Sequence, residues 1–228
     1  MRYGVVFILL GACSLVLAVR EGGLGWFWLW PEIAFTIVGV GYLKVGARVF
    51  GKRPDGSLSP ARLVVLAPFV LFAWGIWAIL VKVSREPAAN EVAPGVWLGR
   101  RLRAGELPRG LELIVDLTCE LWEPRAVRTA CRYVCFPTLD ADAPQIEEIV
   151  RLVGEVKGTV LIHCAQGHGR SAAVAAAVLV ARGIAADGDE AFGMTEKVRP
   201  GVRLSRPQRD ELIRVCSKMS RTKGGSDS

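Results

Sequence analysis

The sequence has few of the residues that build metal sites and nucleic-acid sites. Its 228 residues include only two histidines, and its six cysteines form no CxxC pair, so a zinc site is not expected. Beyond residue 90, twenty basic and eighteen acidic residues nearly balance without a basic stripe, which argues against a nucleic-acid binder. No long segment combines low hydrophobicity with high charge, so a disordered chain is excluded. We expect no metal and no cofactor.

Charge is also scarce in the first ninety residues, which carry nine basic and four acidic side chains. They contain apolar stretches at about 3–19, 26–43 and 63–82, and five of the seven tryptophans. A membrane-spanning helix needs about 20 apolar residues, with roughly 17 as the lower bound, and tryptophan favours the headgroup zone. We therefore predict an all-α transmembrane module over residues 1–84. A cleaved signal peptide is the alternative for residues 1–20, but the apolar run continues past the cleavage-like box at Cys13.

The orientation of this module is ambiguous from the charges. The loop at 44–62 carries five basic residues and one acidic residue, which favours a cytoplasmic loop and an external C-terminal domain. However, Lys82, Arg85 and a basic cluster at 100–103 follow the last stretch. Free thiols fit a reducing compartment. The apolar stretches predict a multi-pass membrane protein, and the free thiols lead us to expect its C-terminal domain in the cytoplasm.

The remainder of the chain is typical of an α/β domain. Residues 85–94 are polar with two prolines and predict a linker, and the polar residues 220–228 predict a disordered tail. Between them, residues 95–219 alternate strand-like and helix-like periodicity, which indicates a mixed sheet flanked by helices. We expect strands at 95–99, 113–117, 132–136 and 159–163, and helices at 143–156, 170–182, 187–198 and 205–218.

One segment of this domain carries recognisable chemistry. The apolar run 159–163 ends at Cys164, a loop with two glycines follows, and a helix of small residues begins at Arg170. Backbone N–H groups at such a strand–loop–helix junction converge on an anion, and the helix dipole adds to the positive field. The planar fork of Arg170 can hold two phosphate oxygens. Cys164 would lie in this field, which favours its thiolate, a nucleophile toward a bound phosphate.

The segment HCAQGHGRS at 163–171 resembles the HCxxGxxRS signature loop of the cysteine-based protein tyrosine phosphatase superfamily, most closely its dual-specificity branch. The resemblance extends over residues 91–218 and implies a dual-specificity-phosphatase-like fold. It also implies that Cys164 forms a phosphocysteine, Arg170 holds the phosphoryl oxygens, Ser171 donates to the sulfur, and His163 orients the loop. The implied phosphate-binding loop consists of Ala165, Gln166, Gly167, His168, Gly169 and Arg170.

The reaction also needs an acid that protonates the leaving alcohol. In this family the acid is an aspartate on a loop upstream of the nucleophile. Two aspartates, Asp140 and Asp142, occur in the segment 136–144. We favour Asp140, three residues after Pro137, over Asp142, whose alternative role is to cap a helix that begins near Pro144. Downstream, Arg203 or Gln208 in a segment like the family's pocket rim is a candidate for substrate contact.

The substrate class is open at this point. The first hypothesis is a membrane-anchored dual-specificity or tyrosine protein phosphatase, and the second is a phospholipid phosphatase of the phosphatidylglycerophosphate or phosphoinositide type. Some lipid-active members carry lysine or arginine inside the loop, whereas this chain has Ala165, Gln166 and His168 there. A third hypothesis is an inactive scaffold that binds phosphorylated partners. The expected partner is thus a phosphorylated protein or a phospholipid.

Overall fold

The computed structural model describes residues 2–224, which divide into two compact units. The helical unit comprises the residues up to 53, residues 57–83 and residues 119–122. The α/β unit comprises residues 54–56, 84–118 and the residues from 123 onward.

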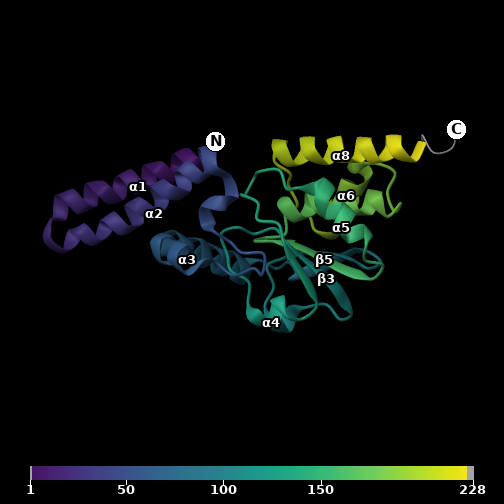
Figure 1. Cartoon of the computed structure of the whole chain (residues 1–228), viewed down its shortest axis with the longest axis horizontal. Coiled ribbons are helices and arrows are strands. Elements are labelled where there is room, and N and C mark those ends of the chain that lie inside the picture. The colour runs from purple at the N-terminus through teal and green to yellow at the C-terminus, as the bar shows by residue number, and fades with distance from the viewer. Residues whose placement is uncertain (1, 225–228) are drawn as a thin grey trace. The chain divides into compact units, whose positions relative to one another are not determined.

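The helical unit contains three helices that are long and apolar enough to cross a membrane, at 3–21, 23–50 and 60–83. The second of these is a composite of short segments, whereas the first and third are regular helices. This agrees with the helical module expected from the sequence. The elements are α1 (Arg2–Glu21), η1 (Gly23–Trp28), α2 (Leu29–Val40), η2 (Gly41–Val45), η3 (Gly46–Phe50) and α3 (Pro60–Val83) (Figure 1).

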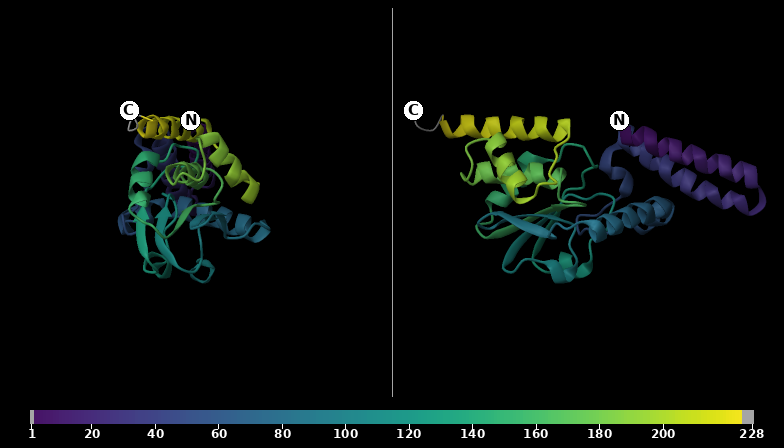
Figure 2. Two further views of the ribbon diagram at one scale, coloured as in Figure 1. Left: turned by 90° about the vertical axis from the view of Figure 1, so that its right-hand side faces the viewer. Right: turned by 180° about the vertical axis from the view of Figure 1, so that it is seen from behind.

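Helices α1 and α2 lie side by side as a hairpin (Figure 1 and the right view of Figure 2). Glycines at their contact explain how the backbones approach so closely. A Cβ added at Gly39 would lie 2.6 Å from the side chain of Ile8 and 2.8 Å from the carbonyl oxygen of Gly4. A Cβ added at Gly11 would lie 2.7 Å from the hydroxyl of Thr36. The hairpin therefore depends on small residues on both helices.

A Gly39→Val substitution is expected to lower the melting temperature of the detergent-solubilised chain. The added side chain has to push α1 away from α2, and overpacking of this kind costs about 1–3 kcal/mol. Circular dichroism melting curves in one detergent provide the measurement. Gly75→Val in α3 is the matched control, since a Cβ at Gly75 meets no atom within 4 Å. Equal melting temperatures for the two variants would contradict the close packing described for the hairpin.

The α/β unit is built on a five-stranded sheet with the strand order β1-β2-β5-β3-β4. The strands are β1 (Ala89–Ala93), β2 (Val96–Arg100), β3 (Leu111–Asp116), β4 (Arg132–Cys135) and β5 (Thr159–Cys164). Strand β1 pairs antiparallel with β2, and every other pair is parallel. The sheet is therefore mixed, as expected, and β5 occupies its centre.

Helices cover both faces of this sheet. The helices are α4 (Arg125–Arg128), α5 (Ile146–Gly154), α6 (Arg170–Ala181), α7 (Gly188–Val198) and α8 (Arg206–Gly224), with a short 3-10 turn η4 (Ala104–Glu106). Figure 1 shows α5, α6 and α8 on one side of the sheet and α4 on the other. Successive strand residues alternate accordingly: Ile162 packs with α6, whereas Leu161 packs with Val127 of α4.

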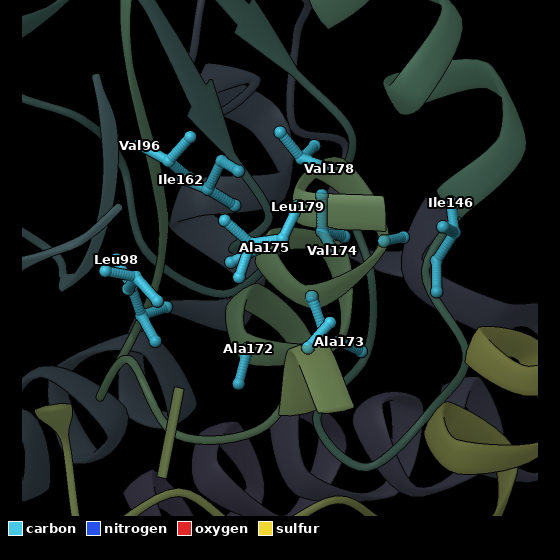
Figure 3. Packing of buried hydrophobic residues seen from close by; sticks show 14 of the residues in the cluster. Val96, Leu98, Ile146, Ile162, Ala172, Ala173, Val174, Ala175, Val178 and Leu179 are labelled. Atoms are coloured by element: carbon cyan, nitrogen blue, oxygen red, sulfur yellow. The ribbon is translucent and has the colours of Figure 1, made fainter. Parts of the chain in front are cut away.

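The core forms mainly between the sheet and α6. Every residue of α6 from Arg170 to Val180 is buried, and most of them are alanine or valine. Figure 3 shows Ala172, Ala175 and Leu179 near the strand residues Val96, Leu98 and Ile162. Small side chains allow α6 to lie close to the sheet, which fixes the position of its first turn. That first turn begins at Arg170, directly after the glycine-containing loop.

The segment predicted as a linker differs from the structure. Residues 89–93 of the expected linker 85–94 form strand β1 at the edge of the sheet. The sequence signal for a strand is weak here, because this short edge strand carries polar residues such as Asn90 and Glu91. Two prolines also flank it. The α/β unit therefore begins before residue 95.

The predicted tail also differs in part. Helix α8 continues through Gly224, so residues 220–224 of the expected disordered tail 220–228 are helical, and residues 225–228 lie outside the described part. The hydroxyl of Ser220 donates to the carbonyl of Cys216 within this helix. The polar composition of residues 220–228 predicted disorder. However, helix α8, which begins at Arg206, continues as a regular helix to Gly224.

Candidate active site

The loop after β5 lies where the carboxyl ends of the parallel strands meet. Strand β5 has parallel neighbours on both sides, and its last residue is Cys164. Ligands of α/β proteins typically bind in the crevice outside this edge of the sheet. The loop then enters α6 through Gly169, the residue before the helix. The nucleophile candidate and the start of a helix are therefore brought together at the centre of the sheet edge.

Cys164 is buried, with 3% of its surface exposed, and two groups contact its sulfur. The N–H of Gly167 donates to Sγ over 3.2 Å. The Ser171 hydroxyl oxygen lies 3.2 Å from the same sulfur. When the sulfur is a thiolate, the hydroxyl of Ser171 has to be the donor. Both contacts then stabilise negative charge on the sulfur, as a nucleophilic thiolate requires.

Arg170 is held in place by main-chain carbonyl groups. Its Nη1 donates to the carbonyl of Thr138 over 2.7 Å and to that of Leu117 over 3.3 Å. The side chain is 1% exposed, so its charge is almost fully removed from water. A guanidinium fixed in this way costs little reorganisation when an anion binds beside it.

The two candidate acids differ in their surroundings. Asp140 is exposed and its Oδ1 lies 3.6 Å from Nε of Arg170. Asp142 instead accepts a hydrogen bond from the N–H of Ala143, and its carbonyl accepts one from the side chain of Gln208. The alternative cap role for Asp142 is wrong, because α5 begins only at Ile146, beyond Pro144, with Gln145 at the cap position. Asp140 is thus the aspartate that lies beside Arg170.

The two downstream candidates have structural contacts. Gln208 is buried, its Oε1 accepts from the N–H of Ser205, and it packs against Gly169. Arg203 donates from Nη1 to the carbonyls of Pro200 and Val202 in its own loop. The backbone N–H of Arg203 also donates to the carbonyl of His168. Gln208 therefore contacts the loop through its side chain, and Arg203 contacts it through its backbone.

His163 belongs to a buried polar network behind the loop. Its Nε2 lies 4.0 Å from Oδ1 of Asp116, and both side chains are almost fully buried. Asp116 accepts hydrogen bonds from Thr118 and from the hydroxyl of Tyr133 at 2.5 Å. Burial, with the nearby charge of Asp116, raises the pKa of Tyr133 far above its ordinary value, so this hydroxyl stays a donor.

A third acidic residue, Glu123, makes this network resemble a metal site in composition. Candidate ligand atoms of Asp116, Glu123 and His163 lie within 4.8 Å of one another. However, Oε1 of Glu123 already lies 3.1 Å from Nε of Arg101, and the Asp116 carboxylate is bonded to Thr118 and Tyr133. Two of the three residues thus already have protein partners, a guanidinium for Glu123 and two hydroxyls for Asp116, which fits a structural network better than an ion site.

Two functional-site neighbours were not singled out from the sequence. Glu86, in the expected linker, lies 2.6 Å from His168 of the loop, and Arg199 lies 3.2 Å from Glu86. Their partners are distant in the sequence, so no local motif signals them. The loop is therefore contacted by the segment that enters the domain.

Gly167 allows the loop to pass close to strand β2. Its φ is +78°, and an added Cβ would lie 2.6–2.8 Å from backbone atoms of Gly99 and Arg100.

We expect Gly167→Ala to weaken binding of inorganic phosphate at least tenfold, since the N–H of Gly167 has to point at the sulfur site. Isothermal titration calorimetry measures this. Gly193→Ala in α7, where a Cβ meets nothing within 4 Å, is the control, and equal affinities would contradict the geometry.

Comparison with known proteins gives matches at the level of structure. No protein-family profile matches the sequence, and no curated protein matches it. A human DUSP28 structure covers 60% of this chain and 99% of its own at 22% identity, with a TM-score of 0.51. PTPMT1 in complex with PI(5)P covers 60% and 99% at 15% identity, with a TM-score of 0.52. A mutant form of Tk-PTP covers 58% and 97% at 26% identity, with a TM-score of 0.52.

These matches cover nearly the whole of each neighbour and about three-fifths of this chain, a share that corresponds in size to the α/β unit. The neighbours are dual-specificity and tyrosine phosphatases. They confirm the fold expected from the signature loop. The chain thus carries a dual-specificity-phosphatase-like fold, accompanied by three helices apolar enough to span a membrane.

Proposed function

We propose that this protein is a membrane-anchored phosphomonoester hydrolase of the dual-specificity or tyrosine protein phosphatase type, acting through a phosphocysteine. One observation carries the proposal: the Cys164 sulfur lies 3.2 Å from both the Gly167 N–H donor and the Ser171 hydroxyl. Arg170 follows on the same loop, and Asp140 lies 3.6 Å from it. The loop thus carries a nucleophile and a cation for the phosphate, and a candidate acid lies beside that cation.

In the first step, the Cys164 thiolate attacks the phosphorus, so that a sulfur–phosphorus bond forms while the bond to the leaving oxygen breaks. Protonated Asp140 gives its proton to that oxygen, and the alcohol departs. Arg170 and the loop N–H groups hold the phosphoryl oxygens, whose charge they balance in the transition state. The first product is the free alcohol, and the phosphoryl group remains on Cys164.

In the second step, water attacks the phosphorus of the phosphocysteine. Asp140, now a carboxylate, takes a proton from the water, and the bond between sulfur and phosphorus breaks. The electron pair returns to the sulfur as a thiolate. The hydroxyl of Ser171 donates to that sulfur and makes it a better leaving group. Inorganic phosphate is then released.

The loop favours a substrate with a single phosphate over a polyphosphorylated one. Its variable positions hold Ala165 and Gln166, and its third variable residue, His168, is bonded to the carboxylate of Glu86 at 2.6 Å. A carboxylate at this rim repels additional phosphates. A phosphorylated tyrosine, serine or threonine of a protein has the required single phosphate, so a protein phosphatase is our first proposal.

A phospholipid phosphomonoester is the second candidate, and a specific observation favours it. One structural neighbour, PTPMT1, was solved in complex with PI(5)P. In this chain, only a few residues separate the apolar helix α3 from the start of the sheet at Ala89. If α3 is embedded, this tether raises the effective concentration of any membrane-bound substrate.

The test compares full-length, detergent-purified protein with its Cys164→Ser variant. Phosphate release is measured with a phosphotyrosine peptide and with a phosphatidylglycerophosphate-type lipid in mixed micelles. We expect release by the wild type alone, faster with the peptide. Faster release from the lipid would favour the second candidate. Silence of both preparations, with retained binding of inorganic phosphate, would overturn the enzyme proposal in favour of a phosphate-binding scaffold.

We also propose that the α/β unit is on the cytoplasmic side. The exposed position Ser217 on α8 offers a site for a reporter cysteine. In a Cys13→Ser background, Ser217→Cys is expected to react with a membrane-impermeant maleimide only after cells are permeabilised. Labelling of intact cells would place the domain outside instead.

A further inference from the structure

The segment entering the α/β unit contributes a carboxylate to the rim of the phosphate-binding loop. Oε2 of Glu86 lies 2.6 Å from Nε2 of His168 and 3.2 Å from Nη2 of Arg199. Its other oxygen, Oε1, accepts the N–H of Gly201 over 3.2 Å. Glu86 thus connects the loop to the segment that follows α7. All of these residues belong to the same unit.

Arg199 extends the connection to the middle of the loop. It is 2% exposed and donates from Nη2 to the carbonyl of Gln166 over 3.1 Å. Its Nη1 donates to the carbonyl of Pro87 at 2.9 Å and to the side chain of Asn90 at 2.8 Å. One buried guanidinium therefore joins the entering segment, strand β1 and the loop.

The charges make Glu86 necessary to this arrangement. Partial burial raises the pKa of Glu86, but the hydrogen bond to His168 and the charge of Arg199 outweigh this effect and hold the pKa below its ordinary value. Glu86 is therefore ionised at neutral pH. Burial lowers the pKa of Arg199, and the charge of Glu86 opposes that shift. Without Glu86, the buried Arg199 would lose its close counter-charge, which is costly in a desolvated site.

We propose that Glu86 is a positioning residue for the phosphate-binding loop, holding the arc Gln166–His168 through His168 and Arg199. This inference rests on the proposed function, because it assigns Glu86 a part in the same site. The loop N–H groups bind phosphate well only if they already converge before the phosphate arrives. Glu86 fixes two points of the arc, the carbonyl of Gln166 through Arg199 and the imidazole of His168 directly.

If Glu86 positions the loop, the segment that enters the α/β unit is part of the phosphate-binding site. The domain boundary at residue 95 expected from the sequence leaves Glu86 outside the domain, although its partners are inside. Glu86 follows the last residue of α3, Val83, by only a few positions. The segment that follows α3 is thus bonded to the phosphate-binding loop through Glu86 and His168.

The test uses the full-length protein with Glu86→Gln, Glu86→Asp, His168→Gln and the Glu86→Gln/His168→Gln double variant. Affinity for inorganic phosphate and kcat/KM for a phosphotyrosine peptide are measured for each. We expect Glu86→Gln to lower both about tenfold, since small misplacements of binding groups have effects of this order. Glu86→Asp keeps the charge and should recover part of the loss. The double variant should be no worse than the poorer single variant, because the two residues act as a pair.

Glu155→Gln is the matched control, because Glu155 forms an exposed ion pair with Arg132 at the start of β4. A lower melting temperature of Glu86→Gln with unchanged phosphate affinity would overturn the proposal and leave Glu86 a stabilising role only. Tighter phosphate binding would also overturn it, by showing that Glu86 chiefly repels anions. Phosphate affinity is measured without turnover, so an inactive wild type would refute the proposed function while the role of Glu86 is still tested.

Discussion

Replacing Asp140 with asparagine is expected to lower kcat for a phosphotyrosine peptide by about 10²–10⁴-fold, the usual contribution of a general acid. Asparagine keeps the size of the side chain but has no proton to give to the leaving oxygen. The effect should be smaller with para-nitrophenyl phosphate, whose leaving group needs less protonation. Steady-state kinetics with both substrates, recorded across pH, provide the measurement. The basic limb of the pH profile, which reports the protonated acid, should disappear in the variant.

Asp142→Asn is the matched control, because Asp142 lies on the same loop and differs only in its contacts. Its carboxylate accepts the N–H of Ala143, whereas that of Asp140 lies 3.6 Å from Arg170. We expect Asp142→Asn to retain kcat within a few-fold. If Asp142→Asn loses the basic limb and Asp140→Asn retains it, the assignment of the acid is reversed.

The second large effect concerns Arg170. Arg170→Lys should lower kcat/KM by about 10²–10³-fold, the range found when one transition-state donor is lost. Lysine keeps the charge but lacks the planar pair of donors that matches two phosphoryl oxygens. It also cannot reproduce the two bonds from Nη1 to the carbonyls of Thr138 and Leu117 with donors left over for phosphate. The measurements are kcat/KM for the phosphotyrosine peptide and the affinity for inorganic phosphate, both on the same variant.

Arg182→Lys is the control at the other end of the same helix. Arg182 also donates to backbone carbonyls, those of Gly95, Val156 and Gly158, and the whole of α6 separates it from the loop. It should lose some thermal stability and little activity. Equal losses of activity in both variants would show that the Arg170 effect is structural and would contradict its role in phosphate binding.

The loop residues could be predicted because the signal for them is local. A buried strand, two glycines and an arginine at fixed spacing occur within thirteen consecutive residues, 159–171. The apolar runs also located β5 and α6 closely, since buried elements at the centre of a fold carry little polar interruption. The helix expected at 187–198 also begins close to its predicted start, where the side chain of Asp187 accepts from the N–H groups of Asp189 and Glu190.

The parts that could not be predicted depend on contacts distant in the sequence. Strand β1 is a polar edge strand, and only its pairing with β2 reveals it. Glu86 lies 82 residues before His168, so nothing near it in the sequence indicates its partner. The sequence also left two aspartates as candidates for the acid, and the bend of the loop after Thr138 brings Asp140 toward Arg170. In each case the missing information was three-dimensional.

The most direct test of the account is to identify the phosphorylated intermediate. Full-length protein turning over para-nitrophenyl phosphate is quenched in acid within milliseconds to seconds, digested, and analysed by mass spectrometry. We predict a phosphoryl group on the peptide that contains Cys164, with a larger fraction in Asp140→Asn, which lacks the base for the second step. Phosphate release without any phosphorylated Cys164, or with the phosphoryl group on another residue, would contradict the proposed mechanism.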